Sequence, residues 1–372
     1  MHSAADNISW IEALSPWPEE FGLGRMRRLL AELGDPQDAF RAIHVVGTNG
    51  KTTTTRMCAA LLVAEGKTVG AYTSPHVIGW GERTQVNGEP VDLEAALARV
   101  RPAAEAIDAT QFEALTAAAL AEFRAAGVDA AVVEAGLGGR LDATNVLDAP
   151  VVVLTNVDLE HTDVLVGTRG EIAREILAVI RSGATAVLGE PEWEELARET
   201  GAAAVVVTGR SNLALAVAAA ESFLGKQVDP APAEEATVPG RLEGVGDAPL
   251  EIWDGAHNLG GVGYVLARLP SRRYVVVASI LADKDAEVML AALSALGDTF
   301  VATQSTNSRA LAAGELAATA GRFFDRVETV PEPAEAVERA RALAGGDGAV
   351  LVTGSLYLLA DLAAVRPQAP VP

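Results

Sequence analysis

The chain has 372 residues and a mass of 38.5 kDa, which exceeds the usual size of one domain and favours two domains with separate cores. Hydrophobic residues make up 49% of the sequence and charged residues 21%, a composition typical of a globular protein and not of a disordered one. The 29 Lys and Arg against 50 Asp and Glu leave a formal charge of −21, which would repel a nucleic acid backbone. We therefore expect no nucleic acid partner and expect any polyanionic ligand to be bound by local features.

Cysteine content and hydropathy bear on the compartment. The single cysteine, Cys58, cannot form an intrachain disulfide or a zinc cluster of thiolates, which fits a reducing compartment. Residues 1–20 lack the basic stretch and apolar core of a signal peptide, and no run approaches the roughly 18 apolar residues of a membrane span. We expect a cytoplasmic protein that is monomeric and has no membrane partner.

From about residue 43, short apolar runs rich in β-branched residues alternate with longer Ala- and Leu-rich stretches of helical period. This alternation predicts parallel strands joined by helical crossovers. In chain order we expect strands at 43–46, 68–72, 130–134, 151–155 and 184–188, and helices at 52–64, 93–106, 112–126 and 169–181.

A Pro-rich, acidic stretch at 228–239, VDPAPAEEATVP, has no period and is the best candidate for a linker. We therefore predict two domains, 1–235 and 236–372. Strands are expected in the second at 250–253, 274–278, 299–303, 326–330 and 349–353. We expect the α/β fold class: a first domain with a parallel sheet, for which the loop at 44–55 described next predicts a P-loop ATPase domain, followed by a smaller Rossmann-like α/β domain.

The strongest local signal is HVVGTNGKTTTT at 44–55, where a strand runs into a glycine-rich turn that opens a helix. Gly47 and Gly50 let backbone N–H groups point at phosphate oxygens, the helix N-terminus adds its dipole, and Lys51 reaches the β- and γ-phosphates. Thr52 or Thr53 offers a hydroxyl to Mg²⁺ or phosphate. The loop is shorter than the common P-loop spacing, and the alternative is an ordinary turn with a solvated lysine. The preceding strand and the scarcity of lysine, four among 29 cations, argue against that alternative.

GTNGKTT resembles the ATP loop of the Mur ligase superfamily, and the motifs that follow resemble folylpolyglutamate synthase, which in many bacteria also serves as dihydrofolate synthase. The matching motifs occur in the family's order: TSPH at 73–76, FEALT at 112–116, EAGLGGRLDATNV at 134–146, EHT at 160–162, PGRLE at 239–243, DGAHN at 254–258, LADKD at 281–285 and TGSLYL at 353–358. The resemblance implies an ATP- and Mg²⁺-dependent ligase that joins L-glutamate to a folate or dihydropteroate carboxylate.

The chemistry of that reaction explains the residue types. A carboxylate is a poor electrophile, so ATP first phosphorylates it, and the glutamate amine then attacks the acyl phosphate through a tetrahedral intermediate. Two anions, the γ-phosphate and the substrate carboxylate, must meet, which requires a cation such as Lys51 and one or two Mg²⁺ ions. Glu134 ends a predicted buried strand, where open α/β sheets place ligand groups.

Residue by residue, the resemblance implies four groups of site residues. Catalytic roles fall to Lys51, Glu134 and His161, and Mg²⁺ ligands are Ser74, Glu134 and His161. The ATP site comprises Gly47, Thr48, Asn49, Gly50, Lys51, Thr52, Thr53, Asn212, Arg241 and Asp254. The substrate site comprises Arg25, Thr110, Phe112, Asp142, His257 and Asn258.

Most of these residues also have an ordinary structural interpretation. Glu134 could pair with an arginine such as Arg140, and Ser74 could start a turn before Pro75. His161 could cap a helix, Arg241 could be a surface cation and Asp254 a helix N-cap. Phe112 could equally belong to the core.

The sequence departs from the family in three places. The family's GTNGKGS loop reads GTNGKTT here, which leaves open which hydroxyl serves. Where the family has a lysine that is carbamylated to bridge a second Mg²⁺, Ile176 stands here, and an alkyl chain cannot ligate a metal. Either the second ion is held more weakly, by His161 and the substrate, or another carboxylate such as Glu175 or Glu160 compensates, or the activity is altered. The segment between 188 and 212 is also short, which indicates a compact variant. Alternative functions are a Mur-type amino-acid ligase acting on a non-folate carboxylate, or a non-catalytic nucleotide-binding relative.

Overall fold

The structure is a computed structural model that describes residues 5–158 and 167–366. It divides into two units, one of residues 1–75 and 80–236 and one of residues 76–79 and 237–372. The boundary that we expect after residue 235 remains a prediction of the sequence. No helix in the described part of the chain is long and apolar enough to cross a membrane.

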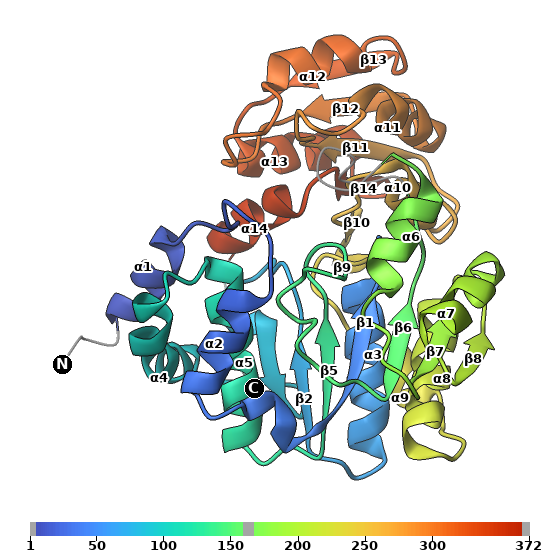
Figure 1. The fold of residues 1–372 in the computed structure, drawn as a ribbon. Coiled ribbons are helices and arrows are strands. Elements are labelled where there is room, and N and C mark those ends of the chain that lie inside the picture. Colours follow the sequence, from blue (N-terminus) through green and yellow to red (C-terminus); the bar gives the residue numbers. More distant parts are fainter. Residues whose placement is uncertain (1–4, 159–166, 367–372) are drawn as a thin grey trace. The chain divides into compact units, whose positions relative to one another are not determined.

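The first unit contains an eight-stranded sheet in the order β4-β3-β2-β5-β1-β6-β7-β8 (Figure 1). The six strands β2, β5, β1, β6, β7 and β8 run parallel to one another, and β3 and β4 add an antiparallel edge next to β2. The strands are β1 Arg41–Val46, β2 Val69–Tyr72, β3 Thr84–Val86, β4 Glu89–Pro90, β5 Ala130–Glu134, β6 Val151–Leu154, β7 Thr185–Leu188 and β8 Ala204–Val207. The predicted α/β class with a parallel sheet is confirmed.

Helices cover both faces of this sheet because the strands are apolar on both sides. In β1, Ile43 and Val45 pack into one core with α3 and α8, while Ala42 and Val46 pack into the other with α4 and α5, as the two-residue period of a strand requires. The helices are α1 Ala5–Ala13, α2 Gly24–Glu32, α3 Lys51–Ala64, α4 Leu93–Ala106, α5 Gln111–Ala125, α6 Arg169–Leu177, α7 Glu194–Thr200, α8 Asn212–Leu224 and α9 Ala231–Glu234.

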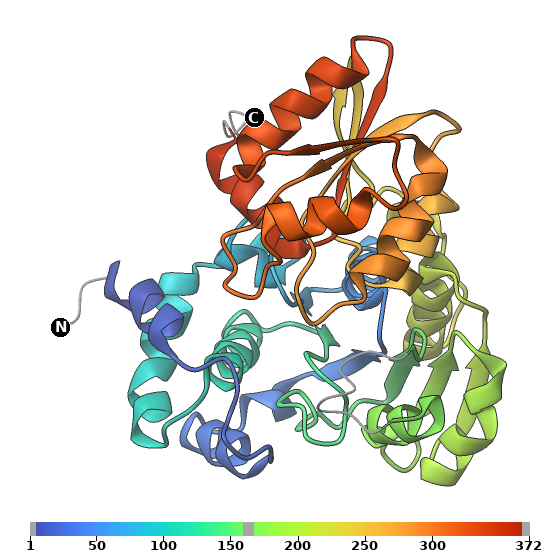
Figure 2. The same ribbon diagram turned by 90° about the horizontal axis from the view of Figure 1, so that it is seen from above.

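The second unit has a six-stranded sheet in the order β13-β12-β11-β14-β10-β9, in which only the edge strand β9 is antiparallel (Figure 2). Helices α10, α11 and α12 pack on one face, and α13 and α14 pack on the other together with Val77. The elements are β9 Glu243–Asp247, β10 Leu250–Trp253, α10 Leu259–Leu266, β11 Tyr274–Ala278, α11 Ala286–Leu293, β12 Thr299–Ala302, α12 Ala313–Ala320, β13 Arg326–Thr329, α13 Pro333–Ala344, β14 Ala349–Thr353 and α14 Leu356–Val365.

Two expectations about local structure need correction. The helix predicted at 169–181 ends at Leu177, because the chain turns there: the amide of Ile180 bonds to the Leu177 carbonyl and the Arg181 guanidinium bonds to the next carbonyls. The proposed linker contains the short helix α9, whose Ala233 is fully buried against α3. Proline is tolerated in the first turn of a helix, so the Pro-rich pattern did not exclude it.

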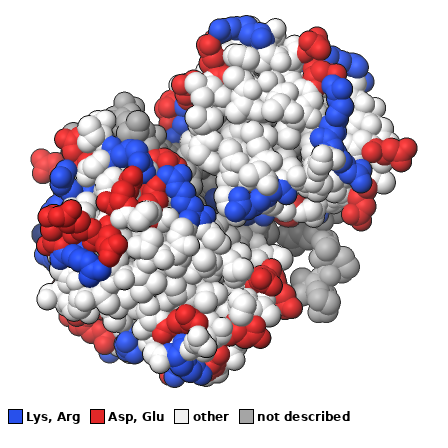
Figure 3. All heavy atoms as spheres, turned by 90° about the vertical axis from the view of Figure 1, so that its right-hand side faces the viewer, with Lys and Arg blue, Asp and Glu red and all other residues white. Residues whose placement is uncertain are grey.

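Surface charge is dispersed on the face drawn in Figure 3. Acidic and basic side chains are interspersed there and separated by broad uncharged areas, and neither sign forms a continuous patch. On this face the net charge of −21 therefore does not appear as one acidic surface.

Candidate active site

Two glycines set the shape of the loop between β1 and α3. Gly47 has φ 132° and Gly50 has φ 82°, values that side chains rarely adopt. Space is also lacking: a Cβ on Gly47 would lie 2.1 Å from Thr155 Oγ1, and one on Gly50 would lie 2.5 Å from Asn212 Oδ1. The loop therefore passes directly against the end of β6 and the start of α8.

The loop is held by its neighbours and by its own lysine. The amide of Thr48 donates to the Asn156 carbonyl at 3.0 Å, and the amide of Asn49 donates to the Asn156 side chain at 2.9 Å. Lys51 Nζ donates to the carbonyl oxygens of Gly47 at 2.9 Å and Thr48 at 3.1 Å. The lysine head thus stays over the turn at the N-terminus of α3, where a phosphate would be favoured.

A buried carboxylate lies beside this helix N-terminus. Glu134, the last residue of β5, is 2% exposed. Its Oε1 accepts a hydrogen bond from the Thr52 hydroxyl at 3.0 Å, and its Oε2 accepts one from the backbone N of Ser74 at 3.0 Å. The structure therefore brings together three of the residues that the sequence analysis assigned to ATP and metal. Arg140 instead pairs with Glu175 at 3.0 Å.

These residues have the chemistry of a magnesium site. Hydroxyl and carboxylate oxygens are hard ligands, and Mg²⁺ usually takes one or two carboxylates and completes its shell with water and substrate phosphates. Within residues 5–158 and 167–366 no group of three or more His, Cys, Asp or Glu side chains is placed to hold a metal. The residues present fit an ion held partly by a bound phosphate.

Arg56 is a residue that the sequence analysis missed. It lies one turn beyond Thr52 on α3, is 8% exposed, and donates to the Thr73 hydroxyl at 3.2 Å and to the Glu82 carbonyl. Burial lowers the pKa of this guanidinium, although the negative charges of Glu82 and Glu134 oppose the shift. A helical spacing of four from Thr52 was the available signal, since it puts both side chains on one face of α3.

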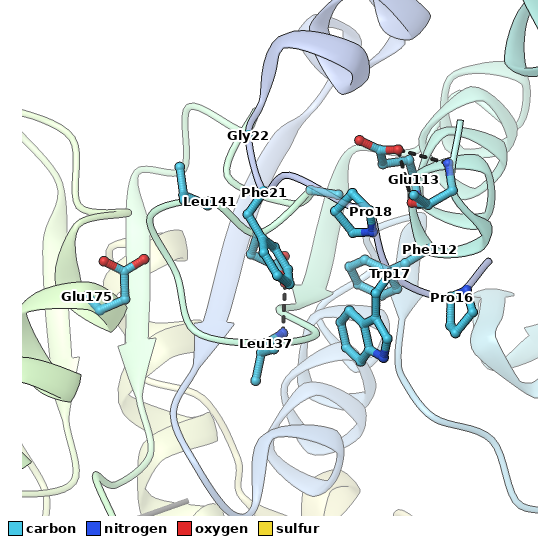
Figure 4. Close-up of a pocket in the computed structure, with 13 residues that line it drawn as sticks. Pro16, Trp17, Pro18, Phe21, Gly22, Phe112, Glu113, Leu137, Leu141 and Glu175 are labelled. Carbon is cyan, nitrogen blue, oxygen red and sulfur yellow. Dashed lines mark hydrogen bonds between the residues drawn. The ribbon is translucent and has the colours of Figure 1, made fainter. Parts of the chain in front are cut away.

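The first unit also contains an aromatic cavity of about 240 Å³ (Figure 4). Leu137 lines this cavity and follows Glu134 by three residues, so a single loop connects the buried carboxylate to the cavity. In Figure 4 the Trp17, Phe21 and Phe112 rings lie near one another, and the centroids of the Trp17 and Phe21 rings are 6.3 Å apart. The lining residues are Pro16, Trp17, Pro18, Phe21, Gly22, Thr110, Phe112, Glu113, Leu137, Leu141, Asp142, Ala143 and Glu175.

Phe112 belongs to the cavity wall and is not enclosed in the core. Its ring lies 6.2 Å from that of Tyr72 and packs directly over Gly136, where an added Cβ would come within 2.5 Å of the ring. The side chain is half-buried. The sequence missed Trp17, Phe21 and Leu141, which are exposed apolar side chains in loops without any periodic pattern.

Arg25 and Thr110 act on one carboxylate. Thr110 caps α5, and its backbone N and hydroxyl each lie 2.9 Å from Glu113 Oε2. Arg25 Nε donates to both oxygens of Glu113 at 3.1 and 3.2 Å. This ion pair joins α2 to α5, and the segment that carries Trp17 and Phe21 leads into α2. The structure therefore places Thr110 in the cavity lining and Arg25 behind it.

Asp142 faces its own loop. It is 6% exposed, and its oxygens accept from the backbone N of Leu137 at 2.8 Å and from the backbone N and hydroxyl of Thr144 at 2.9 and 2.5 Å. Burial raises the pKa of this carboxyl, and the hydrogen bonds oppose the shift. The Thr144 hydroxyl also lies 2.8 Å from Nε2 of His44, whose pKa burial lowers to about 3. This uncharged histidine connects β1 to the loop.

The remaining predicted residues lie in the second unit. Asp254, which directly follows β10 and is 4% exposed, accepts from the backbone N of Leu242 and Ala256, both at 2.8 Å. Burial raises the pKa of its carboxyl, and the Arg241 guanidinium opposes that shift. His257 Nδ1 lies 2.8 Å from the Gly255 carbonyl, and Asn258 caps α10.

Three further residues of the sequence analysis give different outcomes. His161 and Glu160 lie outside the described residues. Ile176 is 2% exposed and packs in the core of the first unit on α6, so an alkyl side chain is fully accommodated there.

Comparison with known proteins identifies the family. The Mur ligase middle domain matches residues 45–231, and the Mur ligase glutamate ligase domain matches residues 240–356. The chain is 33% identical over 401 residues to the dihydrofolate synthase/folylpolyglutamate synthase of Escherichia coli strain K12, covering 95% of this chain and 93% of that protein.

Solved structures agree over nearly the whole chain. The E. coli FolC structure in complex with DHPP and ADP matches with a TM-score of 0.88 at 31% identity and covers 98% of this chain and 97% of that one. A Yersinia pestis folylpolyglutamate synthase/dihydrofolate synthase with Mn, AMPPNP and L-glutamate bound matches with a TM-score of 0.87 at 29% identity, with 98% of both chains covered. These matches show that the chain belongs to the dihydrofolate synthase/folylpolyglutamate synthase family of Mur ligases.

Proposed function

We propose that the chain joins L-glutamate to the carboxylate of a folate or dihydropteroate, with ATP and Mg²⁺, at the site built around the 47–53 loop and Glu134. The family to which the chain belongs consists of ATP-dependent ligases that form a C–N bond between glutamate and a folate. Our proposal concerns the residues that carry out this reaction here. The observation that supports it most is the single loop that leads from Glu134 into the aromatic cavity.

The reaction has two steps. A carboxylate oxygen of the folate substrate attacks the γ-phosphorus of ATP, the bond to the β-bridging oxygen breaks, and ADP leaves. The glutamate amine then attacks the acyl carbon, the C–N bond forms, and inorganic phosphate and a proton are released. Both steps concentrate negative charge, which the Lys51 ammonium and the backbone N–H groups at the start of α3 stabilise.

Magnesium supplies charge neutralisation at the transferring phosphoryl group when it is bound. Glu134 and the Thr52 and Ser74 hydroxyls would hold it, because carboxylate and hydroxyl oxygens are hard donors, and Thr52 and Ser74 both contact Glu134, Thr52 through its hydroxyl and Ser74 through its backbone N. We keep His161 as a proposed further ligand on the resemblance alone.

The cavity suits a flat heterocycle. Trp17, Phe21 and Phe112 provide aromatic faces for stacking, and Leu137 and Leu141 add apolar surface. Arg25 positions this wall through Glu113. Asp142 presents a carboxylate at the lining while its hydrogen bonds fix the loop, so we propose that it orients polar groups of the ring.

We assign nucleotide contacts in the second unit to Arg241 and Asp254, and glutamate contacts to His257 and Asn258, on the motif matches. Asn212, whose side chain lies against Gly50, is proposed to face the adenine. A cytoplasmic location and a monomeric state complete the proposal, and light scattering of the purified protein tests the second.

The test is release of ADP by the purified protein with ATP, Mg²⁺ and L-glutamate. Three parallel reactions contain dihydropteroate, tetrahydrofolate or no acceptor, and mass spectrometry identifies a glutamylated product. Acceptor-dependent ADP release together with that product is expected. ADP release that is unchanged by either acceptor would contradict the proposal and favour a non-folate carboxylate.

A further inference from the structure

A buried acidic side chain outside the proposed catalytic set connects four segments of the first unit. Glu190 follows β7 and is 5% exposed. Its Oε2 accepts from the backbone N of Val157 at 2.8 Å and from the indole of Trp193 at 2.9 Å. Its Oε1 accepts from the guanidinium of Arg169 at 2.8 Å and from that of Arg210.

The hydrogen bonds keep this carboxylate ionised. Burial alone would raise the pKa of Glu190, but the donors from Trp193, Arg210 and Val157 outweigh it and lower the pKa below its ordinary value. Leaving a buried carboxylate without hydrogen bonds costs folding free energy. The donors to Glu190 are therefore favoured in the positions in which they reach it.

Arg210 extends the cluster to the phosphate loop. Its guanidinium lies 3.9 Å from Asp158 Oδ1, and the other oxygen of Asp158 accepts from the Asn49 side chain at 3.2 Å. The backbone N of Asp158 donates to the Thr48 hydroxyl at 3.0 Å. Arg210 therefore bridges the buried carboxylate of Glu190 and the carboxylate of Asp158, a residue that holds Thr48 and Asn49 in the first half of the loop.

The same arginine stands at the start of α8. Ser211, its neighbour, caps this helix by accepting from the amide of Ala214. Asn212 follows, with its side chain so close to Gly50 that a Cβ there would lie 2.5 Å from Oδ1. Arg210 therefore lies between two residues that contact the loop: Asp158, with which it pairs, and Asn212, which follows it by two positions.

We propose that Glu190 and Arg210 are positioning residues for the nucleotide, holding the 47–53 loop and Asn212 in their binding arrangement. This inference rests on the proposed function, because it assumes that the loop binds phosphate. A loop that is ordered before the ligand arrives loses less conformational entropy on binding. An ion pair between two exposed side chains contributes little free energy. Here only Arg210 is half-exposed, and its partner Glu190 is buried and held by its other hydrogen-bond donors.

The experiment compares Arg210→Met and Glu190→Gln with the wild type. The readouts are the dissociation constant for ADP by calorimetry, the KM for ATP, the KM for glutamate and kcat. Arg198→Met is the matched control, since Arg198 has a similarly exposed side chain but pairs with the half-exposed Glu194. We expect Arg210→Met to weaken ADP about tenfold, the loss of one charge-assisted hydrogen bond, and to leave the KM for glutamate unchanged.

The following results discriminate between the outcomes. The double variant is expected to bind ADP no more weakly than the weaker single variant, because both remove one interaction, and Arg210→Lys is expected to recover part of the affinity. Equal increases in every KM with a lowered unfolding midpoint would show a merely structural role and overturn the inference. If Glu190→Gln does not fold, the Arg210→Met variant alone decides. An ADP dissociation constant of Arg210→Met within twofold of the wild-type value overturns the inference. A wild type that binds no ADP overturns the proposed function and this inference with it.

Discussion

The replacement Ile176→Lys tests whether the family's lysine position is closed to a charged side chain in this protein. Ile176 is 2% exposed and packs in the core of the first unit. A lysine amine placed there would lose its hydration, and burial of this degree lowers lysine pKa values by up to about 3–5 units from about 10.4. A shift of about 4 units or more brings this pKa to about 6 or below, so the amine would then be neutral at pH 7.

The free-energy cost follows from that pKa shift. Deprotonating a group of pKa about 10.4 at pH 7 costs about 1.36 kcal/mol for each of about 3.4 units, or about 4.6 kcal/mol, and only about 1.2 kcal/mol at pH 9.5. The unfolded state binds the extra proton, so the stability of the variant rises with pH towards the unfolded pKa. Between pH 7 and pH 9.5 the variant should regain about 3.4 kcal/mol.

The assay is urea unfolding of the first unit at both pH values, in degassed buffer that keeps the lysine uncarbamylated. Ile176→Met is the control, because it keeps an apolar side chain of similar volume and has no titratable group. The difference in unfolding free energy between the two variants should shrink by about 3.4 kcal/mol at pH 9.5. A difference that is the same at both pH values would mean that the lysine reaches solvent and that the position is not enclosed.

The remaining predictions concern the natural chain and three substitutions. Because Ile176 cannot be carbamylated, we expect ADP release at subsaturating Mg²⁺ to be the same with and without bicarbonate, and stimulation by bicarbonate would disprove this. Lys51→Ala should lower kcat by about 10²–10³ without changing the unfolding midpoint, so near-normal ADP release would remove the loop from the mechanism. Glu134→Gln should raise the Mg²⁺ concentration needed for half-maximal activity, and superimposable titrations would make Glu134 structural. Gly139→Ala would place a Cβ 2.3 Å from the Ile176 carbonyl oxygen, which should lower the free energy of unfolding by about 1–3 kcal/mol and raise the KM for the folate but not for ATP. Gly79→Ala is the control, because a Cβ there would have nothing within 4 Å. Equal KM values in the two variants would contradict the steric argument.

The sequence predicted the elements that have a strong local pattern. The helix Leu93–Ala106 and the strands Ala130–Glu134 and Tyr274–Ala278 begin and end where the periodicity indicates. The glycine loop was found from its composition, because Gly47 and Gly50 are required by backbone angle and by space. Such features depend on residues that are close together in the chain.

Features that depend on distant residues escaped prediction. Arg25 and Glu113 are 88 positions apart, and His44 and Thr144 are 100 apart, and no local pattern marks either pair. The Glu190 cluster is a further case, since each of its donors comes from a different segment. Sequence reasoning placed Asp142 in the substrate site, but only the three-dimensional structure shows that its oxygens bind the loop that carries it.

Net charge illustrates why the site must be built locally. A chain of formal charge −21 repels ATP and folates at long range, but this repulsion is screened beyond about 8 Å at physiological ionic strength. Within that distance the 47–53 loop offers backbone N–H groups, the N-terminus of α3 and the ammonium of Lys51, whose position over Gly47 and Thr48 is fixed by two hydrogen bonds. The buried carboxylate of Glu134 is restrained by Thr52 and Ser74 and becomes an advantage once a divalent cation is bound, because it then attracts the ion that neutralises the phosphates. An acidic protein can therefore bind two anionic substrates, provided that the donors are held in place before the substrates arrive.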